Sequence, residues 1–489
     1  MGRIVAGSYR AIAYYVGLVL LLAGALALTP LLALVVWPEE LPAAKPLLGT
    51  AALLLALGGA AWRWLRPDGE VSLTLQEGGV ALVVAWWVVC SASAIPFLGF
   101  QGLGPIAALF EAVSAWTTTG LSVVDVTQAP HVILLWRSVM QLAGGAGMAI
   151  ILLVTLGGPL GPGLAAAEGR SDQLVPHVRE SARLVLILYA CYAVAGIAGY
   201  IACGMGAFDA VNHAFAAVST GGFSTRPESI GAWDSPAIEA VSLPLMILGS
   251  TNFQTAWLVL HRRWRAVGRN VEVRFTVVAA AVAIGLVLWQ VAAVYPTLGK
   301  SARVAVFETL SALTTTGFST VGYAEWPKLG LLVMLVLMVI GGHTGSTAGG
   351  LKQARAVLLL RSLGWELRRL VLPRGAVVVR DAWAGEARVR VSDPQVVATS
   401  SFLVLYLLAL VAGVAVMTGY GFSLEDSLFE MESSLGTVGL SVGVTGPATP
   451  APVLLVQIAA MLLGRLEFFV VLAAFLKVAR DVGASRRGR

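Results

Sequence analysis

Two clusters of threonine and glycine recur in this chain almost letter for letter. SAWTTTGLSVV occupies positions 114–124, and SALTTTGFSTV occupies positions 311–321. Threonines followed by glycine are poor material for the middle of an apolar helix, because β-branching and backbone freedom both weaken helices. Such residues are well suited to an irregular loop whose backbone carbonyls contact a cation. Their repetition therefore raises the question of a cation-binding site.

Two further clusters extend the pattern to four copies, aligned on a final glycine. Each copy has a glutamate or histidine nine residues before that glycine, a serine or alanine six before it, and a small-residue interruption of an apolar run after it. The final glycines are Gly120, Gly222, Gly317 and Gly439; the earlier residues are Glu111, His213, Glu308 and Glu430, then Ser114, Ala216, Ser311 and Ser433; the interruptions are AGGAG (143–147), LGSTN (248–252), GGHTGSTAGG (341–350) and LLGR (462–465).

The elements that must hold these clusters are apolar. The chain has 489 residues, of which 57% are hydrophobic and 12% charged, and its mean hydropathy is +0.82. Soluble domains carry about 25% charged residues, so the composition predicts an integral membrane protein with many spans and not one very large soluble core. The three cysteines lie in apolar stretches without metal-ligand spacing, which indicates small buried residues and no disulfide framework.

Ten apolar runs are long enough to cross a membrane, which takes about 20 helical residues. They lie at 11–37, 46–65, 78–98, 131–156, 183–204, 237–260, 275–295, 329–360, 397–418 and 451–476. Four shorter segments, at 105–118, 207–220, 304–315 and 424–437, each end in one of the clusters. Their length predicts re-entrant or interfacial segments.

The basic residues support re-entrant segments. With a cytoplasmic N-terminus and segments that re-enter from outside, all but seven of the 33 Lys and Arg residues fall on the cytoplasmic side, as the positive-inside rule requires. The net charge of +6 therefore indicates membrane topology and not a nucleic-acid surface. The seven exceptions are Lys45, Arg137, Arg226, Lys300, Arg303, Lys328 and Arg465.

Four re-entrant loops of one topology can surround a single axis. Irregular backbone at membrane depth is tolerated only where protein buries it or where it lines a watery cavity. A ring of carbonyls can replace the hydration shell of a monovalent cation, and the negative C-terminal ends of four short helices favour a cation as well. We therefore interpret the clusters as a selectivity filter. The alternative, small-residue packing between helices, leaves the short helices and their register unexplained.

Over residues 10–478 the chain resembles the Trk/Ktr/HKT superfamily of potassium transporters, most closely its bacterial Trk-type membrane subunit. The resemblance lies in FEAVSAWTTTGLS (110–122), FAAVSTGGFST (215–225), IGAWDSP (230–236), SALTTTGFST (311–320), GGHTGSTAGGLK (341–352) and MLLGRLE (461–467). It implies an all-α integral membrane fold of four repeated helix–re-entrant pore loop–helix units around a pseudo-fourfold pore, preceded by two extra N-terminal transmembrane helices. The expected division is 1–70 for the two leading helices, 71–165, 175–265, 270–365 and 390–480 for repeats 1 to 4, and 481–489 for a basic cytoplasmic tail.

The resemblance also implies the residues that meet the ion, mainly through backbone carbonyls. They are Thr118, Thr119, Gly120, Thr220, Gly221, Gly222, Thr315, Thr316, Gly317, Thr437, Val438 and Gly439. Glycine at the last position of all four loops favours potassium, because serine in the first loop goes with sodium transport in plant relatives. The fourth loop, LGTVG, offers fewer hydroxyls. We expect Glu111, Glu308 and Glu430 to favour the positive ends of their helices, with direct potassium binding as the alternative.

In the family, an intramembrane loop below the filter acts as a gate. The matching residues are Gly341, Gly342, His343, Thr344, Gly345, Ser346, Thr347, Ala348, Gly349 and Gly350, and their five glycines exclude a stable helix. A hinge without a gating role is the alternative, and pH sensing by His343 is left open. The arginine matching Arg465 projects into the pore and sets an electrostatic barrier; a structural ion pair is the alternative.

These features imply potassium uptake across the bacterial inner membrane, with both chain termini cytoplasmic, K⁺ as the transported ion, no organic cofactor and no nucleic-acid partner. The chain shows no Walker A motif, no HExxH and no Ser/His/Asp arrangement, so we expect no enzyme. The family implies a homodimer and a cytosolic nucleotide-binding regulatory subunit (TrkA-like), for which the loops 261–274 and 361–380 are candidate contacts.

Three alternatives remain from the sequence. One is a sodium-permeable member of the same family, or one coupled to Na⁺ or H⁺. A second is a secondary transporter built from inverted repeats, which the common topology of the four units opposes. The third is a membrane enzyme, which would need clustered Asp, His or Glu at membrane depth.

Overall fold

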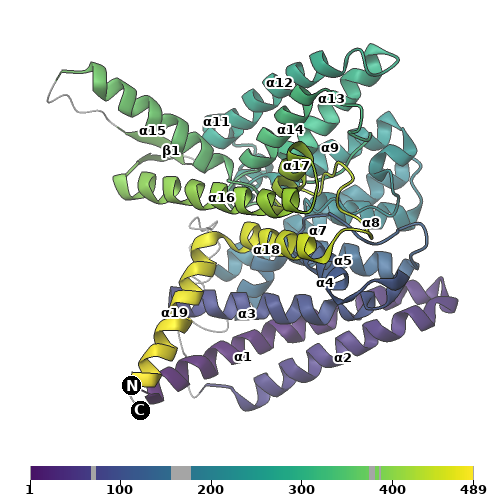
Figure 1. Cartoon of the computed structure of the whole chain (residues 1–489), viewed down its shortest axis with the longest axis vertical. Coiled ribbons are helices and arrows are strands. Elements are labelled where there is room, and N and C mark those ends of the chain that lie inside the picture. Colours follow the sequence, from purple (N-terminus) through teal and green to yellow (C-terminus); the bar gives the residue numbers. More distant parts are fainter. Residues whose placement is uncertain (1, 68–72, 156–177, 374–379, 385–386, 488–489) are drawn as a thin grey trace.

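The computed structural model describes residues 2–67, 73–155, 178–373, 380–384 and 387–487. Helices form almost all of it, which confirms the all-α class (Figure 1). Within the described residues, six helices are long and apolar enough to cross a membrane, and two bent helix pairs raise this number to eight. A short antiparallel hairpin, β1 (Asp381–Ala384) and β2 (Ala387–Arg390), was not predicted from the sequence.

Two long helices precede the first repeat and lie along one side of the molecule (Figure 1). They are α1 (Gly2–Leu26) and α2 (Leu41–Trp64), joined by the 3-10 turns η1 (Thr29–Val35) and η2 (Pro38–Glu40). A Cβ added at Gly58 would lie 2.7 Å from the carbonyl oxygen of Gly17, so small residues let the two backbones approach closely. Glu40 accepts hydrogen bonds at 2.9 Å from the backbone N–H groups of His131 and Val132, which fixes this pair of helices to the first repeat.

Each repeat has a long first helix, a short second helix and a third element that carries the chain back. The bounds are α3 (Leu75–Ser93), η3 (Ile95–Phe97), η4 (Phe100–Gly102), α4 (Pro105–Trp116) and α5 (His131–Thr155); α7 (Val178–Ala202), α8 (Ala207–Val218), η5 (Ser229–Trp233), α9 (Pro236–Ser250) and α10 (Phe253–Leu260); α11 (Trp264–Arg269), α12 (Val271–Val291), α13 (Leu298–Leu313), α14 (Lys328–Ile340) and α15 (Gln353–Val371); and α16 (Asp393–Gly419), α17 (Leu424–Leu435), α18 (Ala451–Leu466) and α19 (Phe468–Arg487). The expected junction between repeats 1 and 2 falls in 156–177, outside the described residues.

Local sequence explains where the short helices start. Pro105 opens α4 at a position where a missing backbone N–H costs nothing. Ser423 caps α17 by accepting a hydrogen bond from the backbone N–H of Asp426 at 3.1 Å, and Thr297 caps α13 in the same way through Lys300 at 3.2 Å. Three of the four short helices, α4, α13 and α17, are therefore defined at their first residues as well as by the clusters that end them.

Three of the four expected interruptions break a helix. The chain bends by 117° between α9 and α10 and by 100° between α18 and α19, and a loop over 341–352 separates α14 from α15. The expected spans 237–260, 329–360 and 451–476 are therefore not continuous helices. The break in the fourth repeat lies at Glu467, which has φ of 63°, two residues beyond LLGR.

The expected break at AGGAG in the first repeat is wrong, because α5 is continuous through these residues. A Cβ at Gly144 would collide with the carbonyl oxygen of Trp116 at the end of α4, and one at Gly145 would lie 2.8 Å from Cβ of Ser219. The small residues here serve close packing between helices. A cluster of small residues can thus break a helix in one repeat and allow two helices to pack closely in another.

The remaining contacts concern the two ends of the chain and the segment between repeats 3 and 4. The start of α1 and the end of α19 lie together, where the hydroxyl of Tyr9 donates to Asp481 at 3.1 Å (Figure 1). Helices α15 and α16 extend away from the body of the molecule, with the hairpin beside them. The Arg380 guanidinium joins these segments through Glu366 at 3.0 Å.

Candidate functional site

The four short helices end in the same turn. In each repeat, the third residue beyond the last helical residue donates its backbone N–H to the carbonyl five residues earlier. This hydrogen bond is the pattern of a Schellman cap. The bonds run from Thr119 to Ser114 at 2.9 Å, Gly221 to Ala216 at 2.8 Å, Thr316 to Ser311 at 3.0 Å and Val438 to Ser433 at 2.8 Å. The helix ends of all four repeats are therefore built alike, although their sequences differ.

A threonine adopts the left-handed conformation in each of these turns, where glycine is usual. The φ angles are 56° at Thr118, 50° at Thr220, 51° at Thr315 and 49° at Thr437. A β-branched residue with positive φ is an outlier that the surrounding structure must enforce, and such outliers gather at functional sites. Two residues later, the cluster glycines also have positive φ, from 71° to 99°.

The four cluster glycines form a closed ring. A Cβ added at Gly120 would collide with the carbonyl oxygen of Gly221 in the next loop. The same relation holds from Gly222 to Thr316, from Gly317 to Val438, and from Gly439 back to Thr119. Each loop thus presses its glycine against a carbonyl of the following loop, and the fourth returns to the first. The order of contacts gives the pseudo-fourfold arrangement that the repeats predicted.

A vestibule of about 630 Å³ opens onto this ring, and all four cluster glycines line it. Its walls are the loops that follow the glycines, including Ser122, Ser224, Thr320 and Ser441. Arg137 and Tyr323 also reach the lining. The cavity is thus continuous with the ring, and its lining combines hydroxyl-bearing and charged side chains with apolar ones.

The three glutamates of the short helices hold the vestibule loops. Glu111 accepts from the backbone N–H of Val123 at 2.9 Å, Glu308 from Thr320 at 2.7 Å, and Glu430 from Val442 at 3.0 Å. All three side chains are fully buried. None stands in the first turn of its helix, so the expected role at the positive helix end is wrong.

The second repeat has a histidine in place of the glutamate and still makes the equivalent contact. His213 Nε2 lies 2.9 Å from the hydroxyl of Ser224, and its Nδ1 lies 2.8 Å from the carbonyl of Asp209. The carbonyl must accept from Nδ1–H, and in a neutral ring Nε2 then accepts from the serine. The histidine thus ties the second vestibule loop to its short helix, as a carboxylate does in the other three repeats.

In three repeats, the serine six residues before the cluster glycine makes a further hydrogen bond to the backbone of its cluster. The hydroxyl of Ser114 accepts from the N–H of Gly120 at 3.1 Å, and that of Ser433 accepts from Gly439 at 3.0 Å. Ser311 donates to the carbonyl of Phe318 at 2.6 Å. Each fully buried serine thus ties its loop to its own short helix.

Arg137 joins the first two vestibule loops, a role that sequence reasoning did not assign to it. Its Nε donates to Glu111 at 2.7 Å, and its other nitrogens donate to the hydroxyl of Ser122 at 2.9 Å and the carbonyl of Ser224 at 3.3 Å. The guanidinium also lies 3.8 Å from the ring centroid of Phe223. Its position among the seven exceptions to the basic-residue pattern was the signal in the sequence.

The loop over 341–350 lies against the first residues of three clusters. The hydroxyl of Thr347 is 3.0 Å from that of Thr220, and the N–H of Gly349 donates to the hydroxyl of Thr315 at 2.7 Å. A Cβ on Gly349 would collide with the Thr437 hydroxyl and the carbonyl of Gly436. The loop therefore covers the helix side of the ring, opposite the vestibule. The hydroxyls of Thr118 and Thr437 are buried there without a hydrogen-bond partner among the residues that the structure describes.

The rest of this loop is held by neighbouring elements. His343 Nε2 lies 2.8 Å from the hydroxyl of Thr276, and the N–H of Thr344 donates to Glu272 at 2.8 Å. Left-handed glycines with φ of 69° to 75° stand at 341, 345 and 350. The remaining predicted members, Gly342, Ser346 and Ala348, are buried within the loop.

Arg465 lies beside this loop. Its guanidinium donates to the carbonyl of Thr347 at 2.9 Å and to the carbonyl of Gly144 in α5 at 2.5 Å. Glu467, two residues on, pairs with Arg355 at 2.6 Å. Arg465 thus connects the loop to the first and fourth repeats through backbone carbonyls.

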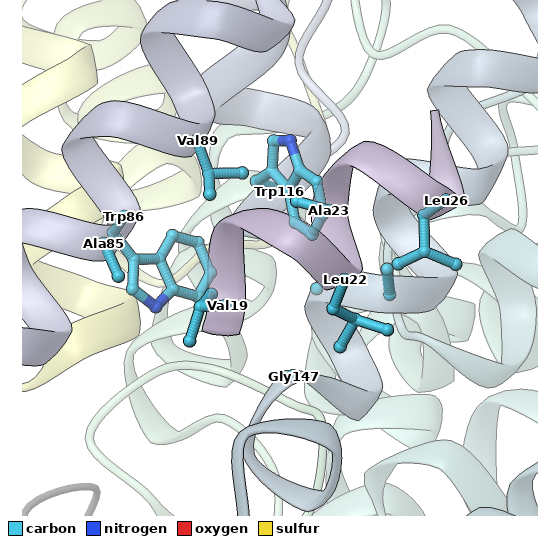
Figure 2. A pocket seen from close by; sticks show the side chains of 11 residues that line it. Val19, Leu22, Ala23, Leu26, Ala85, Trp86, Val89, Trp116 and Gly147 are labelled. Carbon is cyan, nitrogen blue, oxygen red and sulfur yellow. The ribbon is translucent and has the colours of Figure 1, made fainter. Parts of the chain in front are cut away.

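A second, apolar pocket lies between α1, α3, α4 and α5 (Figure 2). It measures about 50 Å³ and is lined by Val19, Leu22, Ala23, Leu26, Ala85, Trp86, Val89, Trp116, Ala143, Gly144 and Gly147. These side chains offer no oxygen ligand to a cation, which requires carbonyls, hydroxyls or carboxylates. The vestibule and ring are therefore the candidate ion pathway.

The chain is similar to known membrane transporters over almost its whole length. Residues 47–481 match the model of the family TrkH, described as a cation transport protein. The Trk system potassium uptake protein TrkH of Escherichia coli (strain K12) is 31% identical over 96% of this chain and 98% of its own. The protein TrkG of the same organism is 31% identical over 87% and 90%. The crystal structure of the potassium transporter TrkH from Vibrio parahaemolyticus superposes with a TM-score of 0.82 at 28% identity, covering 95% of this chain and 98% of the other.

Proposed function

Because this chain belongs to the TrkH family of cation transport proteins, we propose that it carries potassium across the bacterial inner membrane through the ring of four cluster glycines. The observation that carries the proposal is the closed order of glycine-to-carbonyl contacts, from Gly120 through Gly222 and Gly317 to Gly439. A ring of this kind places carbonyls of four loops around one axis, where they can replace the water shell of a monovalent cation.

The transported ion would pass from the vestibule into the ring with little structural change in the protein. Four short helices end at the ring, and their C-terminal carbonyls add a negative potential that favours a cation. Glutamate side chains in three repeats and a histidine in the second tie the four loops to their short helices, and such fixed loops suit a site that distinguishes ions by size and field. We accordingly assign the twelve residues from Thr118 to Gly439 named above as filter residues, with K⁺ as the cargo and no catalytic role.

We further propose that the loop over 341–350 and Arg465 form the gate. The loop covers the helix side of the ring through Thr347 and Gly349, so an ion leaving the ring meets it directly. The positive guanidinium of Arg465 nearby raises the energy of a passing cation. In this proposal, a cytosolic nucleotide-binding subunit acts on the gate loop and opens it. The proposed assembly is a homodimer of this chain with that subunit bound. We keep the four-repeat division and cytoplasmic termini as parts of this proposal.

Rubidium uptake into proteoliposomes that contain the purified chain tests the proposed function. We expect uptake that external potassium blocks and that an equal excess of sodium leaves largely unchanged. Equal competition by sodium would keep the pathway and overturn the potassium selectivity. No uptake by folded protein, with the proposed cytosolic subunit also supplied, would overturn the transport function.

Arg465→Met should raise rubidium uptake in the same assay by about tenfold, because the gate loop loses charged hydrogen bonds that contribute about 1.5–3 kcal/mol each and the pathway loses a positive charge. The comparison variant is Arg303→Met. In the wild type, the Arg303 guanidinium in α13 pairs with Glu239 in α9 at 2.5 Å, and neither residue belongs to the proposed gate. That variant should keep wild-type uptake. Lower uptake by Arg465→Met in a protein of wild-type melting temperature would contradict the gating role.

A further inference from the structure

The middle residue of the second cluster differs from its counterparts. In the first and third clusters this residue is a threonine whose hydroxyl lies 2.8 Å from a second threonine hydroxyl two positions earlier, in the pairs Thr117–Thr119 and Thr314–Thr316. The second cluster has Gly221 at the middle position and so has no side chain with which to make such a brace. Its carbonyl is nonetheless one of the four that close the ring.

A glutamine from the preceding repeat fills this position. Gln141 in α5 is fully buried, its Nε2 donates to the carbonyl of Gly221, and its Oε1 accepts from the N–H of Phe223 at 3.2 Å. The side chain thus holds the backbone on both sides of Gly222. It is the point at which the first repeat determines the shape of the second loop.

The presence of glycine at 221 follows from this glutamine. Gly221 is not among the residues with positive φ, so its backbone conformation would accept a side chain. A Cβ added there would, however, lie 2.5 to 2.8 Å from Cδ, Oε1 and Nε2 of Gln141. The glycine therefore makes room for the amide, and the two residues form one unit.

We infer that Gln141 is a positioning residue for ion selectivity, which fixes the Gly221 carbonyl in the ring and replaces the threonine pair of the first and third repeats. The inference deepens the proposed potassium pathway and depends on it. Without the amide, the carbonyl of Gly221 and the N–H of Phe223 lose their partners, and the second loop is free to take other conformations. Loss of the amide should therefore reduce the selectivity for potassium over sodium more than it reduces the stability of the fold.

The test compares variants by the ratio of sodium to potassium concentrations that halve rubidium uptake, with the melting temperature as a control. Gln141→Ala should lower this ratio about tenfold, the effect of one or two lost buried hydrogen bonds. The double variant Gln141→Ala/Gly221→Thr should recover most of it, because the introduced threonine side chain can pair with the hydroxyl of Ser219 as Thr119 pairs with Thr117. A purely structural loss would not be rescued by adding a side chain at this position.

The matched control is Gln457→Ala, another fully buried glutamine, whose Nε2 donates to the hydroxyl of Thr445 at 2.8 Å and not to a cluster backbone. It should keep the wild-type ratio. If Gln141→Ala fails to fold, Gln141→Met, which keeps the volume and loses both hydrogen bonds, should show the same fall in the ratio.

The outcomes separate the inference from the proposed function. A selective wild-type protein together with an unchanged ratio in folded Gln141→Ala or Gln141→Met overturns the inference alone. A lowered ratio that the double variant restores supports it, and a lowered ratio that the double variant leaves unrestored contradicts the replacement of the threonine pair. A wild-type protein without potassium-sensitive rubidium uptake overturns the proposed function and the inference with it.

Discussion

Rubidium uptake by the variant Gly317→Ser should fall by at least about a hundredfold relative to the wild type. Gly317 has φ of 80°, a conformation that costs a residue with a side chain about 1–2 kcal/mol. An added Cβ would also collide with the carbonyl oxygen of Val438 and lie 2.9 Å from Cα of Gly439. Because both obstacles are backbone atoms of the next loop, they can be relieved only by opening the ring. The combined cost of about 3 kcal/mol corresponds to the expected loss.

The matched control is Gly322→Ser, in the same loop and also in the vestibule lining. Apart from Gly322 itself and its two chain neighbours, no described residue has an atom within 4 Å of a Cβ built at Gly322, and its φ is not positive. This variant should therefore keep wild-type uptake. If Gly317→Ser transports as well as Gly322→Ser, the ion does not pass through the ring. The glycines would then serve only close packing between helices.

Much of this ring could be predicted from the sequence, because its residues are chemically unlike their surroundings. The short segments predicted at 105–118, 207–220 and 424–437 agree with helices that end at Trp116, Val218 and Leu435. A threonine and glycine cluster after each segment marks the end of the helix wherever it occurs. The common spacing of four such clusters then leads to the pseudo-fourfold arrangement.

The continuity of α5 through AGGAG in the first repeat could not be predicted, because small residues permit two different structures. In α9 and α18 they accompany a sharp bend, and in α5 they permit contact with the carbonyl of Trp116. The choice depends on which element lies alongside the helix. A single sequence does not contain that information when the partner is a backbone atom of a different helix.

The side chains that hold the loops in place were not predicted correctly, for a related reason. Glu308 was expected to act on its own helix, yet its partners, Thr320 and Tyr323, lie in a loop that has no regular pattern. Gln141 meets Gly221, which lies 80 positions later in the chain. Polar residues of this kind look ordinary in the sequence, and only the fold shows that their partners belong to the ring.

Arg137→Met should lower the free energy of unfolding by about 3–5 kcal/mol, the usual result of leaving one member of a buried ion pair without the other. Glu111 is fully buried and Arg137 is 2% exposed, so water cannot replace the lost guanidinium. For a chain of this length the loss corresponds to a melting temperature lower by about 3–5 °C. Thermal unfolding of the purified protein in detergent measures this change directly.

Two further variants show whether burial of the charge is the cause. Arg137→Met/Glu111→Gln removes both charges and should recover much of the stability, because the remaining amide can still bond to the vestibule loop. Lys328→Met breaks a pair of similar length, 2.6 Å to Glu425, whose side chains are 81% and 59% exposed, and it should change the melting temperature by less than about 1 °C. Equal losses from Arg137→Met and the double variant would show instead that the guanidinium acts through its contacts with Ser224 and Phe223, which the double variant also removes.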